Sequence, residues 1–464
     1  MDAGTTWDAR AGQEAALHLL RGARASDVLD WTNPAAWTAL DQGVRSVSWH
    51  RRDLAARIRA RPETALCHPD GRIREAALAE KPDTPALLPL VVIRCADWAE
   101  PVRRRARRML AEALESAPEH TLCLLTPLVL RVGRREQGTW ARELFVETLR
   151  TSPYPALPRL RDSTDTATRR LAARITVDHG LLGAPELARR AVDDLDPVLW
   201  RLWSDAALAA MAADAVDDEA VDILLGARAP LVRSAGVTAL RRAGRAREAV
   251  AHLTDRAALV RACARWVVHQ NGGDPRPQYV ELCTDPATVE PFAVSGLAEC
   301  GHREDAALLR PLLTHPVAGV RAQAVGGLRQ LDSTPVEALR PLLDDPSAAV
   351  AREVTWALLP HARRLPANWL GDRLSAWRPT HTRRAAFRLL KAQGGLSELS
   401  AAVALLADTD PRLRRCAESA VQQRRWLDEV PRGDAAVDGL LRQCTHLFSD
   451  YVMSGMRSRV GLSA

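Results

Sequence analysis

Arginine pairs with the spacing of neighbours on one helix face recur along the chain and suggest binding of negative charge. Arg384 and Arg388 are four residues apart, and Arg104 and Arg108 have the same spacing. Residues four apart lie on the same face of an α-helix, so these arginines make that face basic. Trp356 occupies the place in its own segment that Arg388 occupies in the next, where an indole can stack on a base. These side chains could bind an acidic protein segment or a nucleic-acid backbone.

Residues for metal binding are not grouped in the sequence. The chain has eight cysteines but no C-x-x-C pair, and a zinc site needs closely paired ligands. Cys67, Cys95 and Cys123 are 28 residues apart, and Cys416 and Cys444 repeat that interval. Such spacing predicts a small, buried residue at one position of a repeating unit. We therefore expect no metal and no cofactor.

Residues for catalysis are equally scattered. His68, His315 and His361 fall at predicted turns or helix ends, where an imidazole caps the backbone. The acidic runs 193–196 and 217–219 lack the glycine and the spacing of a calcium loop, and they predict solvated helix starts. A glycine-rich phosphate loop is absent from the sequence. We assign no catalytic residue, and the sequence favours a binding protein over an enzyme without deciding between them.

The elements that would position the arginines come from a repeat of about thirty residues. Segment 315–325 has a turn with a proline, an apolar residue, Arg321 and then small helix-forming residues. Segment 345–351 repeats it with Ala351 in the place of the arginine, which we call the anchor position. Aspartates before the turn and arginines after it predict a hydrogen-bonded ladder between neighbouring units. Further anchors are Arg74, Arg103, Arg142, Arg169, Arg201, Arg233, Arg261, Pro291, Arg383 and Arg414.

Each unit is predicted to be a hairpin of two helices. Segment 334–337 would begin a first helix, because it has a threonine cap, a proline in the first turn and an acid. The second helix has apolar residues just before the anchor and three, six and seven residues after it. Val320, Ala324 and Leu328 fit this pattern and share one helix face. No strand-like alternation is sustained, so the sequence indicates an all-α protein.

The predicted fold is a right-handed α-solenoid, or superhelix, of about 11–13 helical hairpins. Residues 1–60 lack the repeat and are predicted to form an N-terminal helical cap with a third helix over 49–61 and a core of Trp31, Trp37 and Trp49. The repeats span residues 61–430, and residues 431–464 would form a C-terminal capping helix and tail. The longer step from Arg103 to Arg142 predicts an insertion or a degenerate unit.

Three segments carry a family resemblance. They are His315-Pro316 with Val320-Arg321, Asp345-Pro346 with Val350, and Asp410-Pro411 with Leu413-Arg414. They resemble HEAT-like repeats of the kind named after phycobilisome lyases, and the resemblance covers residues 61–430. It implies an α-solenoid, and it says little about function, because the family includes scaffolds, chaperone-like adaptors, bilin lyases and a class of alkylpurine DNA glycosylases. No catalytic residue of these relatives matches a position here.

The repeat register assigns one face of the second helices to a binding surface. Residues one, five and eight after each anchor point away from the apolar stripe and should line the concave side of a curved stack. This face is basic and contains two tryptophans; an ordinary solvated face is the alternative. Its residues are Arg104, Arg108, Arg170, Arg174, Arg241, Trp266, His269, Arg329, Arg352, Trp356, Arg384, Arg388, Lys391 and Arg415.

Composition sets the broad class. The net charge of +7 comes with richness in Ala, Arg, Gly and Pro that is typical of a GC-rich genome, so the position of the charge matters more than its sum. No apolar run is long enough to span a membrane, and the N-terminus lacks a secretory pattern, so we expect a cytoplasmic location and no membrane partner. We expect a HEAT-repeat scaffold or adaptor that binds an acidic protein partner. A nucleic-acid-binding protein or a HEAT-like DNA glycosylase is the alternative.

Overall fold

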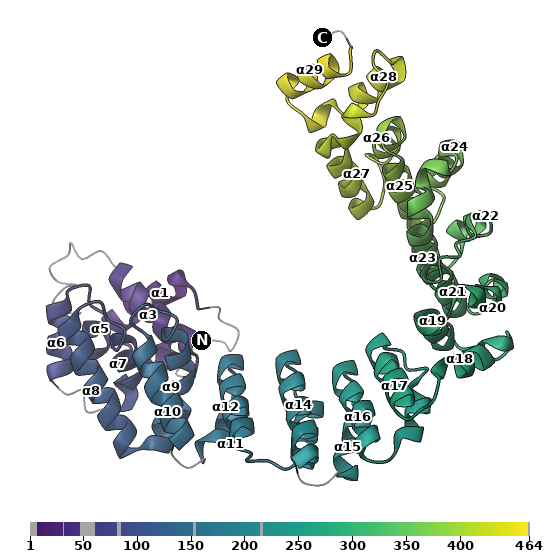
Figure 1. Cartoon of the computed structure of the whole chain (residues 1–464). Coiled ribbons are helices and arrows are strands. Elements are labelled where there is room, and N and C mark those ends of the chain that lie inside the picture. The colour runs from purple at the N-terminus through teal and green to yellow at the C-terminus, as the bar shows by residue number, and fades with distance from the viewer. Residues whose placement is uncertain are drawn as a thin grey trace. The chain divides into compact units, whose positions relative to one another are not determined.

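The computed structural model describes residues 7–30, 32–46, 61–80, 85–151, 155–213 and 217–462. Over these ranges the chain consists of helices and connecting turns and contains no strand, which confirms the predicted all-α class (Figure 1). None of the described helices is both long and apolar enough to cross a membrane. The chain divides into two compact units, Met1–Val232 and Arg233–Ala464, called unit 1 and unit 2.

Unit 1 is built from helices that follow one another closely along the chain. Its helices are α1 (Ala9–Leu20), α2 (Ala25–Val28), α3 (Pro34–Ser46), α5 (Pro62–Ala65), α6 (Gly71–Ala79), η1 (Pro85–Leu87), α7 (Leu88–Arg94), α8 (Glu100–Ser116), α9 (Pro118–Val132), α10 (Thr139–Thr151), α11 (Ala156–Arg161), α12 (Thr166–Asp178), α13 (Ala184–Asp193), α14 (Pro197–Ala213) and α15 (Asp218–Leu225). Helix α16 (Pro230–Arg242) crosses the boundary between the units.

Unit 2 continues with a regular alternation of shorter and longer helices. Its helices are η2 (Ala246–His252), α17 (Ala258–Gln270), α18 (Pro275–Thr284), α19 (Pro291–Cys300), η3 (Arg303–Asp305), α20 (Ala306–Leu309), η4 (Pro311–Thr314), α21 (Ala318–Gln330), α22 (Val336–Leu339), η5 (Arg340–Asp344), α23 (Ala348–Leu358), η6 (Leu359–Arg364), α24 (Ala367–Gly371), η7 (Asp372–Leu374), α25 (Thr380–Gln393), α26 (Gly395–Ala404), α27 (Pro411–Gln423), η8 (Arg425–Asp428), α28 (Ala435–Gln443), η9 (Thr445–Leu447) and α29 (Asp450–Arg459).

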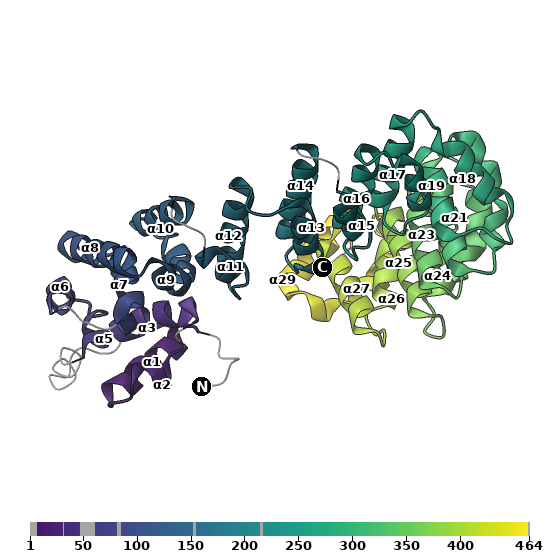
Figure 2. The same ribbon diagram turned by 90° about the horizontal axis from the view of Figure 1, so that it is seen from below.

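The second helices of unit 2 form a continuous stack. Helix α19 packs against α21, α21 against α23, and α23 against α25. Both views show α19, α21 and α23 side by side in chain order (Figure 1, Figure 2). Figure 1 also shows α18, α20 and α22 in a second row along one side of these helices. Each helix buries an apolar stripe on its neighbours, and Val320, Ala324 and Leu328 are fully buried as the repeat pattern predicts. This is the hairpin stacking expected of an α-solenoid; its handedness stays a prediction.

The first helices of several unit 2 hairpins are broken. The helix predicted to begin near residue 334 begins at Val336, ends at Leu339 and gives way to a 3₁₀ turn that contains Pro341. Proline lacks the backbone donor that an α-helix needs, so the chain tightens into a 3₁₀ turn there. Pro311 has the same effect after α20. Leu339 and Leu343 are nevertheless fully buried, because the tight turn still directs both side chains inward.

The predicted N-terminal cap region is only partly within the described residues. Helices α1 and α3 pack against each other, and Trp37 is buried between neighbouring apolar residues. Trp31, Trp49 and most of the predicted third helix over 49–61 lie outside the described residues. The long step from Arg103 to Arg142 is filled by α8 and α9, which are joined directly at Ala117. The domain boundaries at residues 60 and 430 stay predictions.

Glycines make the close packing of α1 on α3 possible. A Cβ atom added to Gly43 would overlap the carbonyl of Gly12, and one added to Gly12 would overlap the carbonyl of Ala39. The backbones of α1 and α3 are therefore in direct contact at these two positions. This contact is possible only because neither glycine has a side chain.

Replacing Gly43 by alanine should lower stability, because the added methyl group forces α1 and α3 apart; overpacking of this kind costs about 1–3 kcal/mol. Gly439→Ala in α28 is the control, since no atom lies within 4 Å of its added Cβ, and it should raise stability by about 0.5–1 kcal/mol. Denaturant unfolding midpoints followed by circular dichroism measure both. An unchanged or higher midpoint for Gly43→Ala would contradict the packing argument.

Candidate binding site

An arginine–aspartate pair joins each of several hairpins to the next. Arg321 on α21 donates through Nε and Nη2 to the two carboxylate oxygens of Asp345, at 2.8 and 2.9 Å. The same carboxylate accepts from the backbone N–H of Ser347 at 2.8 Å and so caps the turn before α23. Arg321 Nη1 also donates to the carbonyl oxygens of His315 and Pro316, at 2.7 and 3.0 Å. One guanidinium group thereby fixes its own turn and the following turn together.

This arrangement recurs and confirms the predicted ladder at four anchors. Each of these arginines reaches an aspartate in the next turn, and each of these aspartates accepts from the backbone N–H two residues further on. The four pairs are Arg74 with Asp97, Arg233 with Asp255, Arg321 with Asp345, and Arg383 with Asp408. Arg170, next to the anchor Arg169, takes this role with Asp196, while Arg261 pairs with Glu299 instead of an aspartate. Arg142 and Arg201 are exposed and stay outside the ladder.

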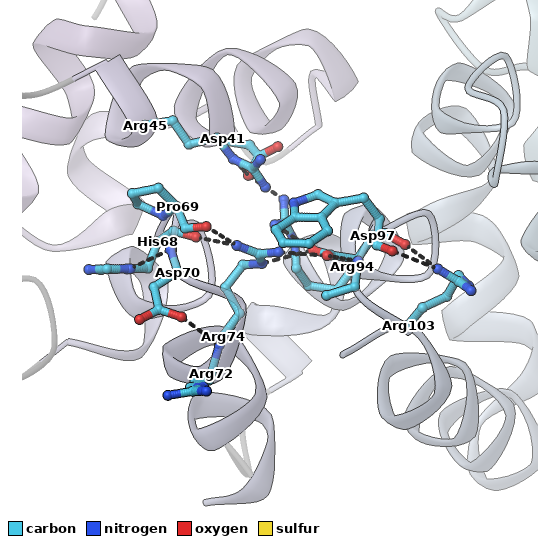
Figure 3. Close-up of polar contacts among 12 residues, drawn as sticks. Asp41, Arg45, His68, Pro69, Asp70, Arg72, Arg74, Arg94, Asp97 and Arg103 are labelled. Atoms are coloured by element: carbon cyan, nitrogen blue, oxygen red, sulfur yellow. Dashed lines mark hydrogen bonds and ion pairs between the residues drawn. The ribbon is translucent and has the colours of Figure 1, made fainter. Parts of the chain in front are cut away.

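Figure 3 shows the most deeply buried pair, which extends through Arg94 to Asp41, and Asp41 also pairs with Arg45. Arg74 and Arg94 are almost completely inaccessible to solvent, and both bind Asp97. Arg94 also donates to Asp41 on α3, so the network ties α3 to the α7–α8 turn. Burial alone would raise the pKa of Asp97, but the hydrogen bonds from Arg74 and the charge of Arg94 hold that pKa below its ordinary value.

Breaking a ladder pair should cost stability in a pH-dependent way. Burial raises and Arg321 lowers the pKa of Asp345, and the net effect is a pKa below the ordinary value. A depressed carboxyl pKa stabilises the fold above the unfolded pKa, and that stability is lost as pH falls through the folded pKa. Asp345→Asn should therefore destabilise unit 2 by about 3 kcal/mol at pH 7. The difference from wild type should begin to shrink below about pH 4, the ordinary carboxyl pKa. It should be lost only when the pH falls through the lower pKa of Asp345 in the folded protein.

Glu337→Gln is the matched control for Asp345→Asn. Glu337 pairs with Arg340 at 2.9 Å, but its side chain is 83% exposed, so removal of its charge should change stability by less than about 1 kcal/mol. Urea unfolding at pH 7 and at pH 3 measures both variants. Equal effects of the two substitutions at pH 7 would show that the buried pair carries no special stability.

Residues that the sequence marked for other reasons also serve the turns. The Nδ1 atoms of His68 and His315 accept from the backbone N–H groups of Asp70 and Val317, as their predicted capping role requires. Asp217 caps α15 by accepting from Ala220, which confirms the helix-start interpretation of that acidic run. Within the described residues, no group of three His, Cys, Asp or Glu is placed to hold a metal ion.

Predicted binding residues meet at two adjoining grooves of unit 2. One groove, of about 570 Å³, lies between α25 and α27. The other, of about 270 Å³, lies between α23 and α25. Arg384 and Arg388 line both grooves and so form the ridge between them. Arg352 lines the smaller groove, and Lys391 and Arg415 line the larger.

Trp356 is connected to the same surface. Its ring is 48% exposed, and the guanidinium group of Arg388 stands 5.0 Å from the ring centre. Contact with the ring orients Arg388 without neutralising its charge. We define the basic face of unit 2 as Arg352, Trp356, Arg384, Arg388, Lys391, Arg412 and Arg415.

The basic face differs from the ladder because its positive charge is largely uncompensated. Among the described residues, the guanidinium groups of Arg384, Arg388 and Arg412 form no direct ion pair with a carboxylate. The pKa of the nearby Asp410 is lowered mainly by the backbone N–H of Leu413, and the charge of Arg384 contributes to the same shift. Lys391 donates only to Gln423, at 3.4 Å, and Arg415 only to the carbonyl of Pro411, at 3.2 Å, within the same set. Arg352 contacts Glu353 at 3.4 Å with an exposed side chain. The arginines of the ladder form ion pairs within the fold, whereas the cationic side chains of the basic face point to solvent.

The other predicted residues of unit 2 do not join the two grooves. Arg241, Trp266, His269 and Arg329 are exposed, and none of them lines either groove. Arg241 stands 5.9 Å from the ring centre of Trp266, which is 44% exposed. The register therefore placed these side chains at the surface correctly, but it did not distinguish them from the residues that form a groove.

In unit 1 the predicted residues are more strongly neutralised. Arg104 and Arg108 line a groove of about 420 Å³ beside Trp140, but Glu100 lies in the same groove and pairs with Arg104 at 3.3 Å. Arg170 is held by Asp196 in the ladder. Arg174 is exposed and lies outside the groove. This part of the predicted face offers less free positive charge than unit 2 does.

The sequence interpretation missed several lining residues of the α25–α27 groove. Phe387 and Leu413 form its floor, and Arg412 and Cys416 stand on α27. Arg412 and Arg415 are three residues apart, a helix-neighbour spacing that could have identified Arg412. The prediction that Cys416 is buried is wrong, since its side chain is exposed, whereas Cys67, Cys95 and Cys444 are buried as predicted.

Comparisons with known proteins leave the family open. No protein-family model matches the chain, and no curated protein matches it. Among solved structures, the chain is similar to the crystal structure of YibA from Escherichia coli, at 16% identity over 61% of this chain and 97% of that one. The TM-score of that superposition is 0.24.

Proposed function

We propose that the chain is a HEAT-like helical scaffold or adaptor that binds an acidic protein partner through the basic face of unit 2. The observation that carries the proposal is the ridge of Arg384 and Arg388, which lines two grooves and has no carboxylate partner among the described residues. The stacked hairpins supply a rigid support on which such a surface keeps its shape.

The energetics of α25 support a binding role for its arginines. Like charges four residues apart on a helix repel each other and destabilise it slightly. Arg384 and Arg388 have this spacing, and Lys391 adds a third charge one turn further on the same face. The anchor arginines of these second helices are paired with aspartates, as Arg383 is with Asp408 on α25 and Arg321 is with Asp345 on α21. Carboxylates of a partner would neutralise the positive charge of Arg384, Arg388 and Lys391, for which this chain provides no ion-pair partner among the described residues.

One observation favours nucleic acid as a second candidate. Trp356 is half exposed beside Arg388, and an indole next to a guanidinium group can stack a base while the cation holds a phosphate. The alternative of a HEAT-like DNA glycosylase would use the same residues. The two candidates differ in what Trp356 contributes: stacking on a single strand is worth about 1–3 kcal/mol per base, which an acidic peptide does not need.

Charge reversal at the ridge tests the proposal. Arg384→Glu with Arg388→Glu should weaken binding of a fluorescein-labelled, glutamate-rich peptide by about tenfold or more, because both grooves lose their shared cations. Fluorescence anisotropy at low and at physiological salt measures the affinity. Arg329→Glu is the control, since Arg329 is an exposed arginine of unit 2 outside both grooves and should have a small effect.

A second arm of the same measurement uses a single-stranded DNA oligonucleotide and Trp356→Ala. If the partner is an acidic protein, the peptide should bind more tightly than DNA of equal charge, and Trp356→Ala should change peptide affinity by less than about threefold. Tighter DNA binding that falls steeply with salt and drops about tenfold in Trp356→Ala would establish the nucleic-acid candidate instead. No binding of either probe at low salt would remove both.

A further inference from the structure

The α25–α27 groove combines an apolar floor with cationic walls. Phe387 and Leu413 lie at its floor and are nearly buried by the helices themselves, and the exposed thiol of Cys416 lies beside them. Arg384, Arg388 and Lys391 stand on the α25 wall, and Arg412 and Arg415 stand on the α27 wall. No carboxylate lines this groove. A ligand here meets positive charge on both sides and an apolar surface between them.

The dimensions of the groove suit a short peptide. Lys391 follows Arg384 by seven residues on α25, which is about 10 Å along the helix axis. An extended chain advances about 3.3 Å per residue, so this wall faces three or four residues of a bound segment. Successive side chains of an extended segment point to opposite sides, which would direct one toward the floor and its neighbours toward the cations.

We propose that this groove binds a short acidic segment of a partner protein in which carboxylates flank one large apolar side chain. The proposal rests on the function proposed above and specifies its ligand. Carboxylates of the segment pair with the arginines of both walls, and the apolar side chain covers the exposed thiol of Cys416 and the small exposed part of Phe387. Rim-exposed ion pairs are individually weak, so the apolar side chain supplies the discrimination among acidic sequences.

The floor distinguishes this ligand from nucleic acid. Leu413 is aliphatic and the ring of Phe387 is only 5% exposed, so neither offers an open aromatic face to a base. Trp356, which does offer such a face, lines neither groove and contacts Arg388 from outside the α25–α27 groove. A leucine or phenylalanine side chain of a peptide, in contrast, lowers the free energy of binding by burying apolar surface, and this burial needs no flat aromatic face.

Cys416 reports occupancy of the groove directly. It is exposed, whereas the other seven cysteines are buried or half-buried. A neutral maleimide should therefore alkylate Cys416 first in the folded full-length chain, and a ligand on the groove floor should slow that reaction. Intact mass and peptide mapping identify the modified residue.

The experiment compares two acidic twelve-residue peptides of equal charge that differ only at one central position, leucine or alanine. The leucine peptide should bind about tenfold more tightly, since a leucine side chain buries more apolar surface than a methyl group. It should also slow alkylation of Cys416 at saturating concentration. A single-stranded DNA oligonucleotide of equal charge completes the set.

Two variants separate the charged walls from the floor. Arg412→Gln with Arg415→Gln should weaken both peptides together and keep their affinity ratio. Cys416→Asn places a neutral polar group beside the floor without changing the charge of the groove, and it should reduce the leucine peptide toward the affinity of the alanine peptide. Both changes are at exposed residues, and Arg329→Gln is the control for a neutralised arginine elsewhere in unit 2. Thermal unfolding checks that each variant is folded.

Each outcome decides between the two levels of the proposal. Equal affinities of the two peptides would overturn the apolar requirement and leave the proposed function standing. Binding without slower alkylation of Cys416 would overturn the placement in this groove and also leave the proposed function standing. DNA binding without peptide binding, or no binding of any probe, would overturn both.

Discussion

A guanidinium group that holds two consecutive turns at once is the interaction on which the stack depends. Arg321 binds the carbonyls of its own turn and the carboxylate of Asp345 in the next, and Asp345 caps that next turn through Ser347. The pair therefore sets the distance and the rotation between neighbouring hairpins, beyond what apolar contact alone would specify. Non-directional burial tolerates sliding, whereas a two-pronged hydrogen bond does not.

The fixed rotation between neighbouring hairpins aligns the solvent-facing sides of their second helices. Residues at equivalent positions of successive helices come to lie next to each other, so charges on α23, α25 and α27 add up at one surface. Arg352, Arg384 and Arg415 each follow an anchor by one residue; Arg352 and Arg415 line one groove each, and Arg384 lines both. Arginine thus has two roles one residue apart: the anchor Arg383 is paired inside the stack, and Arg384 is unpaired outside it. The neighbouring position on a helix is rotated by about 100°, which is enough to separate the two roles.

Burial, ladder pairing and exposure of side chains could be predicted from the sequence, because they depend on position within the repeat. Local departures from the repeat could not be predicted in this way. The burial of Val320, Ala324 and Leu328, the ladder pair of Arg321 and the exposure of Arg388 all follow from position within the unit. Broken first helices at Pro311 and Pro341 do not follow from it, because the hydrophobic spacing is kept while the backbone tightens. Which exposed residues line a groove cannot be deduced from phase either, since that depends on the size of side chains on the neighbouring helix.

Cys416 illustrates the limit of arguing from intervals alone. Its distance from Cys444 equals the spacing of the buried cysteines of unit 1, yet it follows its anchor Arg414 by two residues and faces solvent. An interval that matches the period shows that two residues are equivalent only when both are counted from the same anchor. Arg169 still binds the carbonyls of its own turn at the same offsets as Arg321 does, but the neighbouring Arg170 makes the bond to Asp196 in the next turn. Position relative to the turn, and not spacing along the chain, determines whether a side chain in this stack is buried, paired or free to bind.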